Sequence, residues 1–289
     1  MARRCFLIVN PTSGTFSQSK IDHVIAALTR SGLDPVLLPT GNPMDPALFA
    51  SRICAEIPDP LIAVAGGDGT VNGVLNGLAP GAATLGVIPL GTSNVLAREL
   101  QIQSVDHAVR LLAGGKSRSA PVGELQCAGQ KRRFLLMAGI GVDGAVVQGV
   151  RLREKRVIGK GAYFLSALRV LLAWDGSELQ VVGGGSSFSC HSVIVCNAAR
   201  YGGNFLLAPG GDIFSPGFQV VCIKGGRLSY LKLALLLAQG RVRTDRSVTF
   251  LEASELEISG GKAIQLDGDY FGRGAVQLRS IPDFVRLIV

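Results

Sequence analysis

A glycine-rich turn between an apolar run and a helical pattern constrains this chain more than any other stretch. The apolar run covers residues 61–65, and the turn reads Gly66-Gly67-Asp68-Gly69-Thr70. Apolar residues then recur with helical spacing at Val71, Val74, Leu75 and Leu78. Because the spacing i, i+3, i+4, i+7 places these residues on one helix face, the sequence predicts a buried strand, a tight turn and a helix N-terminus in direct succession.

This turn has the composition of a phosphate-binding loop. Glycine adopts positive φ angles and leaves no β-carbon between the main-chain amides and a ligand. The helix adds unpaired N–H groups and the positive end of its dipole. Asp68 would repel a phosphate unless Mg²⁺ lay between them, so the turn indicates a nucleotide triphosphate with a metal ion. The alternative is an ordinary strand-to-helix turn in which Asp68 caps the helix.

The first 120 residues alternate between strand and helix patterns. Strands are predicted at 6–9, 35–38, 61–65 and 84–88, and helices near 21–28, 46–57, 71–78, 94–99 and 105–113. This order predicts an α/β fold, with a doubly wound nucleotide-binding domain at residues 1–120. Ligands on such sheets bind at the carboxyl ends of the strands, where polar turns follow at 10–14, 66–70 and 89–94.

The pattern changes at about residue 121. Short strand-like runs follow at 133–137, 178–182, 187–195, 218–223, 254–258 and 263–266, with helical interruptions at 161–173 and 230–239. We therefore expect a mainly antiparallel β domain over 121–280. The last apolar run, 284–289, fits either sheet, which leaves residues 281–289 open as a completion of the first domain.

Composition excludes several classes of protein. Hydrophobic residues make up 47% of the chain, yet no apolar stretch approaches the ~18–20 residues of a membrane-spanning helix. Six scattered cysteines lack metal-site spacing and indicate free thiols in a reducing cytoplasm. The net charge of +8 predicts an anionic partner.

Several motifs occur together in a characteristic order: Asn10–Gly14, Gly66–Asn72, Pro89–Asn94, Gly139–Gly144 and Asp267–Asp269. On these motifs the chain resembles the diacylglycerol kinase-type lipid kinases, including soluble bacterial diacylglycerol and sphingosine kinase-like proteins. A more distant likeness extends to NAD kinases. The resemblance implies a magnesium-dependent enzyme of lipid metabolism and phospholipid biosynthesis that transfers the γ-phosphoryl group of ATP to the hydroxyl of diacylglycerol or a sphingoid base.

The resemblance also implies which residues act. Asp68 would hold Mg²⁺ on the triphosphate through water. The nucleotide site would comprise Asn10, Pro11, Thr12, Ser13, Gly14, Thr40, Gly66, Gly67, Asp68, Gly69, Thr70, Val71, Asn72, Thr92 and Asn94.

A lipid hydroxyl needs a positioned acceptor for its proton. In the resembled family this base is the acid that closes a D-G-E motif. Here the motif reads Asp267-Gly268-Asp269, so Asp269 is the candidate base, one methylene shorter than glutamate and with about 1.5 Å less reach. The alternative is a plain Asp-Gly hairpin between strands at 263–266 and 275–278.

Two positions depart from the family pattern. Gly73 stands where the family usually has glutamate, which leaves one polar contact open. Pro216-Gly217 replaces an Asp-Gly pair that helps to ligate a structural metal in the family. Asp212 lies nearby, but we expect no structural metal.

Basic residues gather at Arg151, Arg153, Lys155, Arg156 and Lys160, and again at Arg241, Arg243 and Arg246 after the apolar stretch 228–239. They indicate peripheral binding to an anionic membrane at its inner face, or else a solvated surface beside a core helix. Nucleic acid is not expected, because aromatic residues are not interleaved with these charges. A homodimer stays open. Alternative functions are an NAD kinase-like enzyme with a soluble substrate, and a nucleotide- or lipid-binding protein without catalysis.

Overall fold

The computed structural model describes residues 2–151, 153, 154, 159 and 161–289. The chain divides into two compact units. The first unit comprises residues up to Val122 together with Pro282–Val289, and the second comprises Gly123–Ile281. Two strands run from one unit into the other, β5 (Ser117–Cys127) and β18 (Val276–Ile288).

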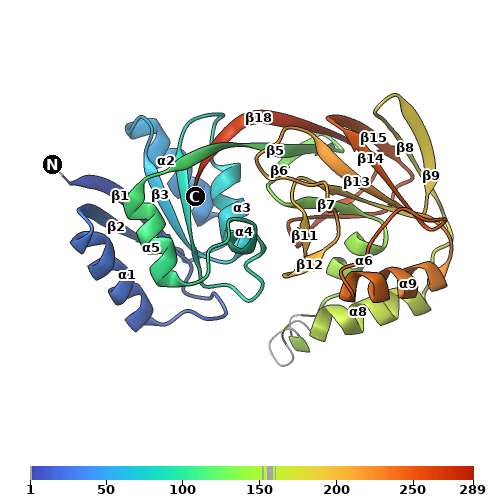
Figure 1. Ribbon diagram of the computed structural model, residues 1–289, viewed down its shortest axis with the longest axis horizontal. Helices are drawn as coiled ribbons and strands as arrows, with labels where there is room; N and C mark the ends of the chain where they lie inside the picture. Colours follow the sequence, from blue (N-terminus) through green and yellow to red (C-terminus); the bar gives the residue numbers. More distant parts are fainter. Residues whose placement is uncertain (1, 152, 155–158, 160) are drawn as a thin grey trace. The chain divides into compact units, whose positions relative to one another are not determined.

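The first unit is built on a parallel sheet in the order β2-β1-β3-β4-β18 (Figure 1). Its strands are β1 (Arg3–Val9), β2 (Leu33–Pro39), β3 (Leu61–Gly66), β4 (Thr84–Pro89) and the end of β18. All six residues of β3 are buried, as expected for a strand at the centre of a sheet covered on both faces. The apolar runs of β1, β3 and β4 therefore correspond to largely buried strands, whereas β2, at the edge of the sheet, is only partly buried.

Helices connect these strands: α1 (Gln18–Arg30), α2 (Asp45–Glu56), α3 (Asp68–Asn76), α4 (Val95–Glu99) and α5 (Val105–Gly114). Helix α1 contacts α5, and α2 contacts α3. The start of α1 is fixed by Ser17, whose side chain accepts a hydrogen bond from the Lys20 amide. The alternation of strand and helix confirms the predicted α/β fold.

The second unit is a sandwich of two antiparallel sheets. One sheet has the order β14-β13-β10-β7-β16-β17, and in the other β18 pairs with β15, β15 with β8, and β8 with β9. The strands of the first are β7 (Met137–Ile140), β10 (Ser192–Cys196), β13 (Phe218–Ile223), β14 (Val248–Ala253), β16 (Ala263–Leu266) and β17 (Asp269–Arg273). The second sheet uses β8 (Leu179–Gly183), β9 (Ser186–Cys190), β15 (Glu255–Ser259) and the start of β18, while β6 (Gln130–Phe134) pairs with β5.

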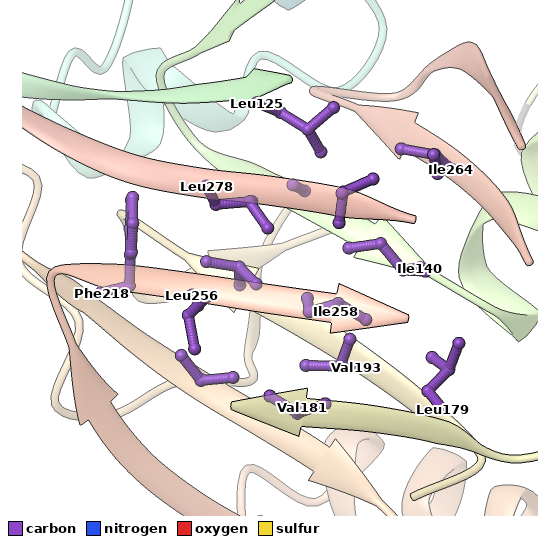
Figure 2. Packing of buried hydrophobic residues seen from close by; sticks show 14 of the residues in the cluster. Leu125, Ile140, Leu179, Val181, Val193, Phe218, Leu256, Ile258, Ile264 and Leu278 are labelled. Carbon is purple, nitrogen blue, oxygen red and sulfur yellow. The ribbon is translucent and has the colours of Figure 1, made fainter. Parts of the chain in front are cut away.

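Apolar side chains from both sheets fill the centre of this sandwich (Figure 2). Ile140 and Val193 come from one sheet, and Val181, Leu256 and Leu278 come from the other. Interdigitation of two inner faces is the usual core of a β-sandwich. The prediction of a mainly antiparallel β domain is confirmed.

Three helices and a small ribbon complete the described part of the second unit. They are α6 (Val142–Gln148), α8 (Gly161–Leu172), α9 (Arg227–Ala238) and the ribbon of β11 (Arg200–Tyr201) with β12 (Phe205–Leu206). Helix α6, the strands β5, β14 and β17, and the ribbon of β11 with β12 have no counterpart among the sequence predictions.

Two predicted strands were wrong in their extent. Residues 133–137 divide between β6 and β7, because the Leu135 and Leu136 amides turn to the Asp267 carboxylate. Residues 187–195 divide at His191, where the chain passes from β9, paired with β8, to β10, paired with β7 and β13. Both breaks follow from contacts between residues distant in sequence.

Candidate functional site

The glycine turn of the first unit joins β3 directly to α3. Strand β3 ends at Gly66 and helix α3 begins at Asp68, as the sequence pattern predicted. A Cβ on Gly66 would lie 2.7 Å from Thr70 Oγ1, so only glycine lets the first helical turn fold back over the end of the strand. The amides of Asp68 and Gly69 precede the first intrahelical hydrogen bond and are therefore available to an anion.

Three turns meet at the carboxyl ends of β1, β3 and β4. A Cβ on Gly91 would lie 2.5 Å from the Cα of Gly67, and a Cβ on Gly14 would lie 2.6 Å from Thr92 Oγ1. The Leu90 amide donates to the Gly66 carbonyl at 3.0 Å. The turns after β3 and β4 thus approach backbone to backbone, which leaves a floor of main-chain atoms at Gly67 and Gly91, where neither residue has a β-carbon.

Polar side chains of the same turns bond to one another. The Asn10 amide group donates to Thr70 Oγ1 at 3.1 Å, and Asn10 Oδ1 accepts from the Thr12 amide at 2.9 Å. Thr40 follows β2, and its backbone N–H donates to the Val9 carbonyl at 2.8 Å, directly before Asn10. The structure thus brings the predicted residues of 10–14, 40, 66–72 and 92–94 to one edge of one sheet.

Asn94 is the strained member of this group. Its φ angle is +46°, and its side-chain Nδ2 donates to the Gly91 carbonyl at 2.8 Å. Its Oδ1 is buried and has no hydrogen-bond partner among the described residues. A buried acceptor without a donor is costly, so a ligand or water with a donor group would stabilise it.

Asp68 links two of the turns. Its Oδ2 accepts a hydrogen bond from the Val95 amide and its Oδ1 accepts one from the Leu96 amide, both at 3.0 Å. The carboxylate therefore caps α4. The alternative interpretation, in which Asp68 caps the helix that directly follows the turn, was wrong about the helix, because that helix is α3. Each oxygen keeps a second lone pair for a further donor, such as water.

These residues fit a nucleotide phosphate better than a metal held by protein alone. The glycine floor and the start of α3 suit phosphate oxygens. Across the described residues, no three His, Cys, Asp or Glu side chains gather in a way that could hold a metal ion. Mg²⁺ would therefore be held by phosphate oxygens and water, with Asp68 bonded to that water.

The second candidate motif, in the second unit, forms the tip of a hairpin. Leu266 pairs with Asp269, and the two residues between them have φ angles of +49° at Asp267 and +89° at Gly268. Positive φ at both positions is typical of a type I′ turn. The Asp-Gly hairpin interpretation is thus correct, but its second strand is β17; the predicted partner at 275–278 was wrong, because those residues run into β18.

Asp267 anchors this hairpin. Its carboxylate accepts hydrogen bonds from the amides of Leu135 at 2.8 Å and of Leu136 and Met137 at 2.9 Å. Asp269, in contrast, has a side chain that is 53% exposed, with the Arg132 guanidinium 3.5 Å away. The first acid of the motif is structural, and the second is the one left accessible to a substrate.

Sequence reasoning missed a buried acid that connects to the same hairpin. Asp143 accepts hydrogen bonds from the Tyr201 hydroxyl and, at 2.6 Å, from Gln265 Nε2. Gln265 Oε1 in turn accepts from the Gly268 amide at 2.7 Å. Burial raises the pKa of the Asp143 carboxyl, against the opposing effect of these two donors. The only signal in the sequence was a lone Asp within Gly139–Gly144.

The departures from the family pattern have local explanations. A Cβ on Gly73 would lie 3.0 Å from Pro46 Cβ, and one on Gly77 would lie 2.1 Å from the Ala47 carbonyl oxygen. Both glycines therefore allow close packing of α3 on α2. Asp212 is engaged within its own turn, where it accepts from the Phe214 amide at 3.0 Å.

The first basic cluster is only partly described. Lys155, Arg156 and Lys160 lie outside the described residues. Arg151 lies 3.8 Å from Glu154, which also pairs with Arg169. Helices with the length and hydropathy needed to cross a membrane do not occur in the described segments.

Comparison with known proteins decides the family. Residues 4–125 match the diacylglycerol kinase catalytic domain, and residues 137–289 match the YegS C-terminal NAD kinase beta sandwich-like domain. The chain belongs to the diacylglycerol kinase family. The matched ranges contain both the glycine turns and the Asp-Gly-Asp hairpin, so the resemblance found in the sequence is confirmed.

Relatives within this family are similar over nearly their whole length. A diacylglycerol kinase of Bacillus subtilis is 29% identical over 280 residues, which covers 93% of this chain and 91% of the relative. A diacylglycerol kinase of Staphylococcus aureus is 28% identical over 284 residues, covering 94% and 88%. The family supports a kinase, and with it the use of ATP.

Solved structures confirm the fold. A crystal structure of a diacylglycerol kinase from Bacillus anthracis has a TM-score of 0.73 at 19% identity, covering 99% of this chain and 96% of that one. Another structure from the same strain has a TM-score of 0.82 at 22% identity, covering 99% and 97%. At these identities the likeness establishes the architecture alone.

Proposed function

We propose that this protein is an ATP-dependent lipid kinase that transfers the γ-phosphoryl group to the hydroxyl of diacylglycerol or a sphingoid base. It would work in phospholipid metabolism, in the cytoplasm and peripherally at the inner face of the membrane. One observation carries the proposal: the turns after β3 and β4 meet backbone to backbone at Gly67 and Gly91, and the turn after β1 joins them where Gly14 packs against Thr92. The family membership and the named relatives support the lipid acceptor.

In this proposal the glycine turns bind the nucleotide, and Asp269 acts on the lipid acceptor. The amides at the start of α3 would bind phosphate oxygens, and Asp68 holds the turn against α4 while its remaining lone pairs would accept from a metal-bound water. Magnesium, when bound with ATP, would neutralise charge on the transferred phosphoryl group. Asp269 would accept the proton of the lipid hydroxyl as its oxygen bonds to the γ-phosphorus, while the bond from that phosphorus to the β,γ-bridging oxygen breaks and ADP leaves.

The exposure of the Asp269 carboxylate suits the role of base. Its ion pair with Arg132, at 3.5 Å, is a weak surface pair, so a substrate hydroxyl can readily replace the guanidinium. Its shorter side chain must be compensated by a closer approach of the lipid, because a displacement of about 1 Å can reduce the rate about 100-fold.

The decisive experiment incubates purified protein with radiolabelled ATP, Mg²⁺ and separate acceptors: a short-chain diacylglycerol, sphingosine and NAD. Transfer to one lipid is expected. Asp269→Asn should lower kcat at least about 100-fold, whereas Asp269→Glu should retain activity. Glu252→Gln, which alters an exposed acid of β14, serves as the matched control. Equal rates for the wild type and Asp269→Asn would reject Asp269 as the general base.

The NAD arm tests a second candidate. The family model for residues 137–289 is described as NAD kinase beta sandwich-like, which favours including this acceptor. Phosphorylation of NAD and of no lipid would replace the proposal with a soluble-substrate kinase. ATP binding without transfer to any acceptor, unchanged by Asp269→Asn, would indicate a binding protein.

A further inference from the structure

Two helices of the second unit each expose a row of apolar side chains along one side. On α8, Phe164, Leu168 and Leu172 are 73%, 49% and 68% exposed. Their spacing of four residues places them on one side of the helix. The opposite side, with Ala162 and Ser166, is buried against the rest of the unit.

Helix α9 repeats this arrangement. Leu228, Leu231 and Leu235 are 80%, 57% and 59% exposed, at a spacing of i, i+3, i+7, whereas Tyr230 and Leu233 are buried. The helix is therefore apolar on its outer side as well as its inner side. Such a helix is either buried or in contact with lipid, because a solvated helix keeps its outer side polar.

The two stripes belong to neighbouring helices (Figure 1). Arg227, the first residue of α9, donates from its guanidinium to the carbonyl of Leu172 at the end of α8, at 3.3 Å. Helix α9 also contacts β12, where Phe205 and Leu206 are exposed. We call the six side chains of α8 and α9 the α8–α9 face: Phe164, Leu168, Leu172, Leu228, Leu231 and Leu235.

The charges around this face select its partner. Residues 227–246 carry five cations against one acid, Asp245, which pairs with Lys232. Arg241, Arg243 and Arg246 are exposed just after α9. A second copy of the chain would oppose these cations with the same cations. An anionic bilayer offers acyl chains to the leucines and headgroup charges to the arginines.

We propose that the α8–α9 face is the membrane-docking surface of this protein, with its six apolar side chains inserted among the acyl chains of an anionic bilayer and Arg241, Arg243 and Arg246 at the headgroups. This inference rests on the proposed function, since a lipid kinase must reach its acceptor in a membrane. The insertion is shallow, because both helices lie along the surface and each exposes a single apolar stripe.

Binding can be measured without any kinase reaction. Trp174 is the only tryptophan and follows α8 by two residues, so energy transfer from it to dansyl-labelled lipid reports docking of this helix. Vesicles of phosphatidylglycerol with phosphatidylcholine should bind the wild type, and pure phosphatidylcholine vesicles should bind it more weakly. Leu228→Ser with Leu231→Ser should weaken binding at least about tenfold.

The matched control is Met44→Ser with Val182→Ser, which alters two side chains that are 73% and 49% exposed outside the α8–α9 face. This variant should bind like the wild type. Replacing Arg241, Arg243 and Arg246 with Gln should reduce the preference for anionic vesicles, by up to about fivefold per residue.

Three results would overturn the proposal: no binding of the wild type to anionic vesicles, equal binding by the α9 double variant, or an equal loss in the control variant. Sedimentation without vesicles adds a fourth, since a dimer abolished by the α9 substitutions would make a second copy the occupant.

A parallel kinase assay with short-chain diacylglycerol in solution separates the proposed docking surface from the proposed function. Vesicle binding without kinase activity would reject the function and keep the surface, and the converse would reject the surface alone.

Discussion

Replacing Asp267 with alanine should destabilise the second unit by about 3 to 5 kcal/mol. The carboxylate accepts three hydrogen bonds, from the amides of Leu135, Leu136 and Met137, at 2.8 to 2.9 Å. The three donor residues are nearly inaccessible, with exposures of 1%, 3% and 5%. A hydrogen bond to a charged acceptor contributes about 1.5 to 3 kcal/mol, so three at the lower bound exceed 4 kcal/mol before water repairs part of the loss.

A series of substitutions at this position separates the hydrogen bonds from the backbone. Asp267 has a φ angle of +49°, which glycine adopts freely and alanine adopts at a cost of about 1 kcal/mol. Asp267→Gly should therefore be less destabilising than Asp267→Ala by about that amount. Asp267→Asn tolerates the left-handed conformation and keeps one side-chain oxygen, so its loss should be about 1 to 2 kcal/mol.

Urea unfolding monitored by Trp174 fluorescence provides the measurement, because this single tryptophan lies in the same unit as Asp267. The expected order of stability is wild type, then Asn, then Gly, then Ala. A loss below about 1 kcal/mol for Asp267→Ala would show that the three amides find other acceptors, and the anchoring role would then be rejected.

Three further predictions concern other parts of the chain. Gly77→Ala should cost about 1 to 3 kcal/mol in urea unfolding followed by circular dichroism, because its Cβ would meet the Ala47 carbonyl at 2.1 Å; a neutral effect would contradict the close packing of α2 and α3. Burial lowers the pKa of His191, so the unfolded chain takes up a proton first and stability should fall as pH drops below 6.5. In His191→Phe this part of the pH dependence should disappear, and an unchanged slope would assign it elsewhere. Asp68→Asn should weaken ATP-induced thermal stabilisation and lower stability by about 1 to 2 kcal/mol, since its amide group would face a backbone N–H; an unaltered thermal shift would reject its place in the nucleotide site.

The fold class was predictable because the central strands of the first unit, β3 and β4, are buried on both faces. A strand such as β3 has no solvent-facing positions, so it appears in the sequence as an unbroken apolar run followed by glycine. The second unit was predictable only in outline. Its breaks at Leu135 and at His191 are set by a carboxylate about 130 residues away and by a change of sheet, and neither leaves a local signal.

In the candidate site, too, features with a local sequence signal were predictable, and features that depend on contacts between distant residues were not. Glycines with a local steric reason, such as Gly66 beneath Thr70, fall within a recognisable turn. Helix α6 escaped detection because it is short and begins inside the glycine-rich segment Gly139–Gly144, which lacks helical periodicity. The hydrogen bond from Gln265 to Asp143 joins residues 122 positions apart, and only the fold brings them together.

The end of β18 has a consequence for how the chain is made. Arg286 and Leu287 pair in parallel with Thr84 and Leu85, and the Phe284 carbonyl accepts from the Gly81 amide. During synthesis, the edge of β4 that pairs with β18 therefore stays unpaired while the whole sandwich is translated. It can pair only after residues 284–288 have left the ribosome. A fragment that stops near Val122 would keep that edge unpaired and prone to aggregation, so expressing the nucleotide-binding half alone requires the last eight residues to be grafted back beside β4.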